Sequence, residues 1–193
     1  MRDIFGMLSI LILLMGCSHN QLKKELATRD IHLVVIDIDH QLNSSAKEAN
    51  IGYAIAENLK SRLENEKGIT VEKRPRRATF KDEKKLAKKG RGVDYIITGV
   101  IDNVSTKRVE YPPRERSEGG SSAGWTEYRA CISGSIKVFK PPFTESKKSF
   151  VFDHICIRQN HENYREMLTR TAPKVAEEIQ DELEAFLVKD TSK

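Results

Sequence analysis

The chain has 193 residues, 38% of them apolar and 32% charged, and its formal net charge at pH 7 is +5. This length predicts one globular domain, since domains commonly hold about 100–200 residues. The only long apolar run stands at the front of the sequence, and apolar residues recur with a clear period behind it. These features exclude a polytopic membrane protein and a disordered chain.

The N-terminus has the layout of a bacterial secretory signal. Arg2 precedes an apolar stretch over 4–17 in which only Ser9 is polar. The stretch is shorter than the ~20 residues that a membrane-spanning helix needs. It ends in Leu-Met-Gly-Cys, which resembles a lipobox, so we expect cleavage after residue 16 and acylation of Cys17. The alternative is an ordinary secretory signal with an incidental cysteine.

The lipobox-like signal also predicts the localisation of the protein and the boundaries of its segments. Ser18 is similar to the residue that sorts lipoproteins to the outer membrane, so we expect a lipid-anchored protein whose domain faces the periplasm. The polar segment up to residue 30 predicts a tether. The boundaries are then a signal peptide over 1–16, a lipidated cysteine and tether over 17–30, one periplasmic domain over 31–188 and a C-terminal tail over 189–193.

Hydrophobic periodicity predicts two strands and two helices in the first half of the domain. The near-continuous apolar run 31–38 is typical of a strand covered on both faces. A capping box at Ser45 and Glu48 introduces a helix over 46–66, and Gly68 follows its end. Residues 69–73 predict a short strand. A second helix begins behind Thr79 and Asp82 and ends at Gly90.

The second half of the domain predicts a sheet and a closing helix. Strands are expected over 93–104, 127–139 and 149–157, and Gly99 inside the first marks a bulge or a close backbone approach. Residues 112–124 predict a flexible excursion, rich in Pro, Gly and Ser. Pro173 should kink or break the long last helix. The order β-α-β-α-β-β-β-α predicts a mixed sheet covered by helices, an α/β or α+β sandwich.

Two cysteines remain after lipidation, and an oxidising compartment favours a disulfide between them. If the hairpin over 127–157 pairs Phe139 with Lys148, Cys131 stands directly opposite Cys156. Directly opposed Cβ atoms are close enough for a disulfide, so we predict a bridge across this hairpin. Two buried free thiols, or a shifted register, are the alternative.

The element order and the sequence Gly-Val-Asp-Tyr-Ile-Ile-Thr-Gly-Val-Ile at 92–101 resemble the periplasmic domain of the curli secretion channel family. The same fold is similar to that of lipoprotein activators of penicillin-binding proteins and of certain flagellar-ring proteins. The resemblance covers about 31–187 and implies a protein that binds partners or oligomerises without catalysis. Charged residues over 107–124 do not suit a membrane-crossing hairpin, so only fold and scaffold role carry over.

Two motifs suggest catalysis. The strand ending in Asp37 and Asp39 resembles the opening motif of haloacid-dehalogenase-type phosphatases, where the first Asp attacks phosphorus and both hold Mg²⁺. That chemistry needs a second acidic pair, and the sequence contains no Asp-Asp and no Gly-Asp. A phosphohydrolase is therefore only the alternative function. Gly-Ser-Ser-Ala-Gly at 120–124 matches a nucleophile elbow, but it lacks the strand-to-helix context that an elbow requires.

A metal site lacks support in the sequence. The five histidines show no helical or other tight ligand spacing. We therefore expect no metal and no cofactor.

Residues 73–91 hold ten basic side chains and two acidic ones. In the envelope such a patch would meet anionic headgroups or an acidic partner, and a periplasmic address excludes nucleic acid. A solvated helix face is the alternative. The 107–125 loop is the other candidate surface, with Trp125 as an anchor or, alternatively, a core residue. The residues predicted to bind a partner are Lys84, Lys85, Lys88, Lys89, Arg114, Arg116 and Trp125.

These inferences together predict a non-catalytic lipoprotein that serves as scaffold or partner-binding component of an envelope machine. Its partners would be an envelope protein complex or further copies of itself.

Overall fold

The computed structural model describes residues 20–36, 38–40, 50–74, 79–88, 92–115 and 121–192. Their α+β arrangement confirms the predicted fold class. The elements are, in order, β1 (Ile31–Val35), β2 (Asp39–His40), α3 (Ile51–Glu64), β3 (Ile69–Val71), α4 (Phe80–Lys88), β4 (Tyr95–Tyr111), β5 (Arg114–Glu115), β6 (Ser121–Ser122), β7 (Trp125–Phe139), β8 (Ser146–Gln159) and α5 (Tyr164–Thr191).

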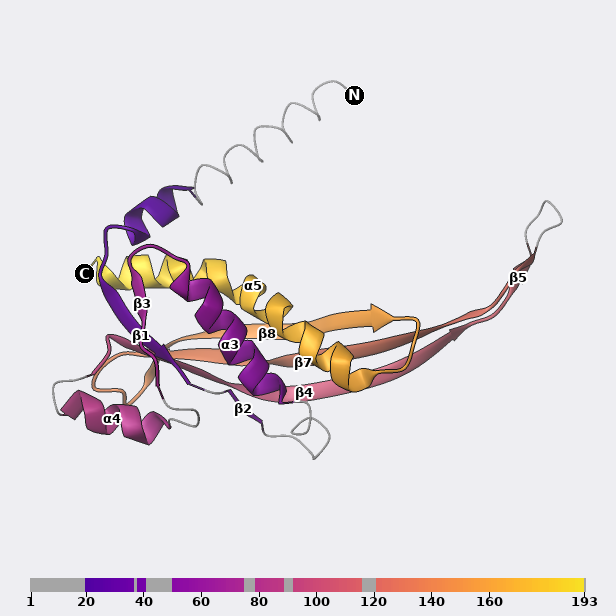
Figure 1. The fold of residues 1–193 in the computed structure, drawn as a ribbon, viewed down its shortest axis with the longest axis horizontal. Coiled ribbons are helices and arrows are strands. Elements are labelled where there is room, and N and C mark those ends of the chain that lie inside the picture. The colour runs from indigo at the N-terminus through magenta and orange to yellow at the C-terminus, as the bar shows by residue number, and fades with distance from the viewer. Residues whose placement is uncertain are drawn as a thin grey trace, which may run out of the picture.

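The main sheet has the strand order β3-β1-β4-β7-β8, and β2 also pairs with β4. β1 is parallel to β3 and β4, whereas β4, β7 and β8 are antiparallel, so the sheet is mixed as predicted. Helices α3 and α5 cover one face of the sheet, as Figure 1 shows. β5 and β6 form a separate two-stranded sheet at the far end.

The main hydrophobic core lies between the sheet and these two helices. Leu33 and Ile97 of the sheet, with Leu59 of α3 and Leu183 of α5, are no more than 1% exposed. Apolar residues spaced about four apart place one side of each helix on the sheet, as the periodicity predicts.

A second, smaller core lies on the opposite face. Val34, Ile96 and Phe143 are buried there, and Phe80 of α4 packs against them. Side chains alternate between the two faces of a strand, so β1 is covered on both, which confirms the prediction for this strand. Farther along, Ser133 and Ser135 of β7 are only half-buried on this face, so helical cover is incomplete there.

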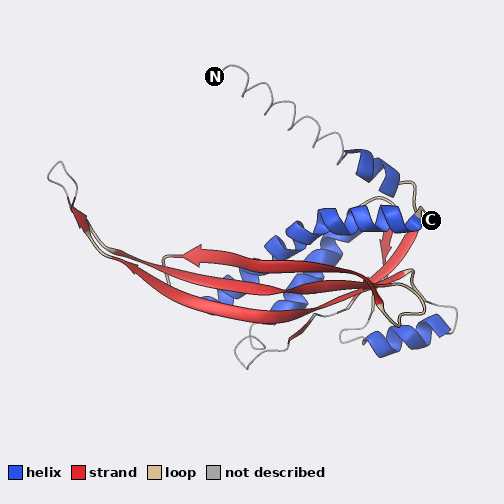
Figure 2. Ribbon diagram, turned by 180° about the vertical axis from the view of Figure 1, so that it is seen from behind, coloured by secondary structure: helices blue, strands red, loops and turns tan. Residues whose placement is uncertain are grey.

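β4 and β7 run past the end of β8, whose last pairing joins Gln159 to Tyr128. Beyond that pair they form a two-stranded projection, here called the arm (109–115 and 121–127), visible in Figures 1 and 2. At about 3.3 Å per residue, each strand of the arm extends ~20 Å. Within the predicted excursion over 112–124, strand pairing stops at 112–113 and 123–124 and resumes where Arg114–Glu115 pairs with Ser121–Ser122, so this part of the segment is not wholly irregular.

Several predicted boundaries differ from the structure. Asn50 adopts the left-handed conformation (φ 53°), so α3 begins at Ile51 and not at residue 46. Pro173 does not break α5, which continues to Thr191 into the predicted tail. At Gly99 the backbones of β4 and β7 approach closely, because a Cβ there would lie 2.4 Å from the Ser135 carbonyl oxygen.

Residues 20–26, which the sequence suggested as part of a tether, are helical, and Leu26 is fully buried. The turn containing Gly68 (φ 85°) passes so close that a Cβ there would lie 2.0 Å from the Leu26 carbonyl oxygen. Arg29 reaches the end of α5, where it donates to Ser192 Oγ at 2.7 Å. The described N-terminal residues thus pack on the domain. No helix of the described residues is long and apolar enough to cross a membrane.

Candidate partner-binding surfaces

An aromatic pair stands at the arm, where Tyr111 and Trp125 are directly opposite in the β4–β7 ladder. Their rings are stacked, with centroids 4.1 Å apart and planes 9° from parallel. Trp125 remains 53% exposed. This exposure contradicts the interpretation of Trp125 as a core residue.

Polar contacts join Tyr111 of the aromatic pair to the neighbouring strand β7. Arg129 donates to the Tyr111 hydroxyl at 2.8 Å and also binds Glu127, which is 8% exposed. The Glu127 carboxylate raises the pKa of Arg129, so the guanidinium keeps its charge. This network holds Tyr111 in place beneath the exposed indole.

A cavity of about 500 Å³ opens beside the aromatic pair. Its lining residues lie where β4 ends and β7 begins: Glu110, Tyr111, Pro112, Pro113, Gly124, Trp125 and Thr126. The lining combines two aromatic rings and two prolines with polar groups, and it contains one charged side chain, Glu110, so it suits the insertion of a side chain from another protein.

The predicted disulfide between Cys131 and Cys156 is present, with the two Cα atoms 4.1 Å apart. It joins β7 to β8 four residues along β7 from Glu127, the last residue of the arm on that strand. The premise of the prediction is wrong, however, because Phe139 pairs with Ser146 and not with Lys148. Register shifts between the two ends of the hairpin account for the difference.

One of these shifts is held by hydrogen bonds at a β-bulge. Ser133 faces Asp153 and His154, donating to the Asp153 carboxylate at 2.7 Å and accepting from the His154 amide at 3.0 Å. His154 has φ 53°, as the extra residue of a bulged strand often requires. The ladder is regular from this bulge outward, so the two cysteines stand opposite each other.

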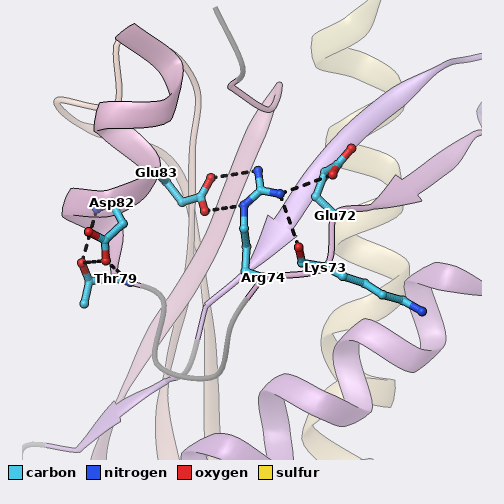
Figure 3. A network of polar contacts seen from close by, with 6 residues as sticks. All are labelled: Glu72, Lys73, Arg74, Thr79, Asp82 and Glu83. Carbon is cyan, nitrogen blue, oxygen red and sulfur yellow. Dashed lines mark hydrogen bonds and ion pairs between the residues drawn. The ribbon is translucent and has the colours of Figure 1, made fainter. Parts of the chain in front are cut away.

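Figure 3 shows that part of the basic segment 73–91 is neutralised internally. Arg74 donates through Nε to Glu83 at 2.7 Å and through Nη1 to Glu72 at 3.3 Å. The Glu83 side chain is 1% exposed, and its hydrogen bond to Arg74 raises the pKa of the guanidinium. Arg74 is therefore a structural residue, and the charge available to a partner is smaller than the sequence count.

Thr79 and Asp82 form the predicted capping box at the start of α4 (Figure 3). The Thr79 amide and hydroxyl donate to the Asp82 carboxylate at 3.0 and 2.7 Å. These bonds lower the pKa of Asp82. The box orients α4 so that Phe80 faces the second core and lysines face outward.

The predicted partner-binding residues divide between two distant places. Lys84 lies 4.8 Å from the centre of the Phe80 ring and Lys85 is exposed, both on α4. Trp125 and the backbone of Arg114 belong to the arm at the opposite end of the molecule (Figure 1). Only the backbone of Lys88 is described, and Lys89 and Arg116 lie outside the described residues.

The phosphohydrolase motif finds no support in the described residues. Asp37 lies outside them, and Asp39 is in β2 beside Val100 of β4. The described part of the chain contains one cluster with metal-ligand geometry, Cys131, His154 and Cys156, whose sulfurs form the disulfide. No carboxylate cluster is present there to complete a site with Asp39.

Two further sequence motifs can be placed. Ser122, within the 120–124 motif, belongs to strand β6, so it does not stand at a strand-to-helix elbow. His32 lies 3.2 Å from the Glu72 carboxylate and 3.3 Å from Asp30, and the Glu72 hydrogen bond raises its pKa. It is a half-exposed histidine satisfied by carboxylates. Cys17 lies outside the described residues.

Tyr111 is a candidate binding residue that the sequence analysis missed. The predicted strand ended at residue 104, although Val109 and Tyr111 continue the alternation of a strand. Extending both strands into the 105–125 region would have placed Tyr111 opposite Trp125.

No protein-family model and no curated protein matches this sequence. Solved structures with similar folds include a protein of Xanthomonas campestris (TM-score 0.49, 9% identity, 86% of this chain and 91% of that one). Others are a neuraminyllactose-binding hemagglutinin homolog of Helicobacter pylori (0.47, 12%, 81% and 84%) and a lipoprotein of Caulobacter crescentus (0.44, 10%, 88% and 97%). Likeness at this level says nothing about function, and the resemblance to the curli secretion channel domain stays a prediction.

Proposed function

We propose that this chain is a lipid-anchored protein of the bacterial envelope that binds a protein partner through its arm and has no catalytic activity. The observation that carries the proposal is the exposed Trp125, stacked on Tyr111 beside a cavity. The partner belongs to an envelope machine such as a secretion apparatus, a flagellar ring or a peptidoglycan synthase, or is a further copy of this chain.

The physical support is that the arm presents a preorganised aromatic surface. Tryptophan and tyrosine are enriched among the residues that dominate binding energy at protein interfaces. Here the indole is already stacked, Tyr111 is held by Arg129, and the disulfide ties the strand below. Binding at such a surface orders few side chains, so little of the contact energy is lost to entropy.

The position of the arm suits an anchored protein. The described N-terminal residues pack at the C-terminal end of α5, where Arg29 contacts Thr191 and Ser192. The arm projects from the opposite end (Figure 1). A lipid on Cys17 would then direct the arm away from the membrane. Anchoring would also raise the effective concentration of the arm for a partner in the same envelope.

Two lysines of α4, the exposed Lys85 and the half-buried Lys84, supply a second proposed contact. Lys84 and Lys85 stand at the end of the molecule away from the arm (Figure 1), so they suit anionic headgroups or an acidic partner surface near the anchor.

The experiment is crosslinking in native envelopes, followed by mass-spectrometric identification of the neighbour. Trp125→Ala should lower recovery of the partner about tenfold or more, as loss of an interface anchor does. The matched control is Val151→Ala, because Val151 is another large exposed apolar residue, 75% exposed, on the body. Equal recovery from both variants would contradict the proposal. Cys17→Ser should release the protein from the membrane fraction.

A further inference from the structure

A second cavity lies between β8 and α5, at the other end of the molecule from the aromatic pair, and its volume is about 500 Å³. β8 is the edge strand of the sheet, and no further strand of the described residues pairs with its outer side. The cavity is lined by Phe150 of β8, by Ala185 and Phe186 of α5, and by three lysines, Lys147, Lys148 and Lys189.

The floor of the cavity is aromatic. Phe150 is 3% exposed and Phe186 is half-buried, and their rings meet edge to face at 6.4 Å. The ring of Tyr95 also meets the ring of Phe186 edge to face, with centroids 6.2 Å apart. Ala185 also lines the cavity, is exposed and has a small side chain that takes up little of its volume.

The rim is cationic. Lys147, Lys148 and Lys189 are exposed, and no ion pair joins them to a carboxylate in the described part of the chain. Lys148 lies 5.6 Å from the centre of the Phe150 ring, so its charge stands directly over the apolar floor.

Two acids also line the cavity, and they differ in availability. Asp190 accepts hydrogen bonds from Lys140 and from the Tyr95 hydroxyl, both at 2.8 Å. Its charge is therefore already compensated within the protein. Glu182 is exposed at the rim, where a solvated carboxylate offsets one of the three lysines. The rim as a whole keeps a net positive charge.

We infer that this cavity binds a free fatty acid, with its chain along Phe150 and Phe186 and its carboxylate among the lysines. An aromatic floor beneath a cationic rim is complementary to an amphiphile with one anionic head. The volume lies within the ~300–1,000 Å³ of small-molecule sites and suits one acyl chain.

The cavity is lined by no residue of the arm. Lys189 lies in the last turns of α5, close to the contact between Arg29 and Ser192. If the proposed anchor is correct, the cavity lies at the end nearer the membrane, which is a source of fatty acids.

The test is photo-crosslinking in native envelopes with a fatty acid that carries a diazirine and an alkyne. The label should map to peptides from 146–152 and 181–190, and unlabelled palmitate should compete. Palmitate methyl ester should compete poorly, because it lacks the anionic head. Labels that map elsewhere, or an ester that competes as well as the acid, would overturn the inference.

Variants separate the contributions. Ala185→Trp should fill the cavity and lower labelling at least tenfold, and each of Lys148→Glu and Lys189→Glu should lower it about fivefold. The control Lys107→Glu reverses an exposed lysine of β4 away from the cavity and should label normally. Undiminished labelling of Ala185→Trp, with an unchanged melting temperature, would also overturn the inference.

The two proposals can fail separately. Trp125→Ala should lose the partner and keep the fatty-acid label, whereas Ala185→Trp should keep the partner and lose the label.

Discussion

The two halves of the β4–β7 hairpin belong to the same pair of strands and yet have different surroundings. In the half next to β1, Ile96, Ile97 and Ile101 of β4 are fully buried. In the arm half, Glu110 is exposed and Tyr111 is covered mainly by its neighbour Trp125. The same ladder is therefore held by packing between layers in the body, and by pairs across the two strands in the arm.

Two ion pairs, one from each region, differ in the same way. In the body, Glu83 binds Arg74 with both side chains largely buried, 1% and 17% exposed. At the base of the arm, Arg108 and Glu110 lie 2.7 Å apart but are 57% and 68% exposed. An exposed pair contributes little to stability, since water competes for both charges. Loss of the buried Arg74–Glu83 pair should therefore lower the stability of the body, whereas loss of the exposed Arg108–Glu110 pair should change stability little.

The disulfide lies where the two regions meet, and its removal has the largest expected effect. The Cys131→Ala and Cys156→Ala double variant should lose about 3 kcal/mol in the free energy of unfolding. The disulfide closes a loop between cysteines 25 residues apart, and without it the unfolded chain has more conformational entropy. Urea denaturation measures the loss. Wild-type protein unfolded with dithiothreitol present should match the variant, and an unchanged midpoint would show that the body alone determines stability.

The two ion pairs sharpen the comparison at a smaller scale. Glu83→Gln should cost about 2 kcal/mol in the free energy of unfolding, because it leaves the charge of the mostly buried Arg74 poorly compensated. Its matched control, Glu110→Gln, should cost about 0.5 kcal/mol or less. Chemical denaturation of both variants provides the measurement. Equal losses would mean that burial does not distinguish the regions.

Glu184 of α5 offers the smallest effect, and it has the opposite sign. It is fully buried, its Oε1 accepts from Gln180 at 2.6 Å, and its Oε2 has no hydrogen-bond partner among the described residues. Burial raises its pKa. The folded protein therefore binds a proton more tightly than the unfolded chain, and stability falls as pH rises from the ordinary glutamate pKa through the raised value.

Glu184→Gln should remove this part of the pH dependence and add about 1 kcal/mol at neutral pH, because no charge is then buried. Denaturation curves from acidic to neutral pH give the slope. Glu178→Gln, an exposed site on the same helix, should leave the slope as in the wild type. A Glu184 variant with the wild-type slope would place the pH dependence elsewhere.

Much of the fold could be predicted because its determinants are local. Periodic apolar residues indicated α3, α4 and α5, and alternation indicated the strands. The capping box at Thr79 and Asp82 was correct, since its partners stand three residues apart. The disulfide was also correct, although a bulge at Ser133 shifts the assumed register. Two helix boundaries were not predicted: the left-handed backbone at Asn50 makes α3 start at Ile51, and α5 continues through Pro173.

The sequence by itself determined the α+β class and the order of the main helices and strands, because these depend on periodicity along the chain. It also suggested the disulfide between the two cysteines, although the register of the hairpin differs from the one assumed. Only the tertiary structure decided that Trp125 stacks on Tyr111 in a projecting arm, that Arg74 is neutralised by Glu83, and that lysines of β8 and α5 surround one cavity. These features join segments far apart in the sequence. Their geometry depends on contacts between segments that only the folded chain brings together.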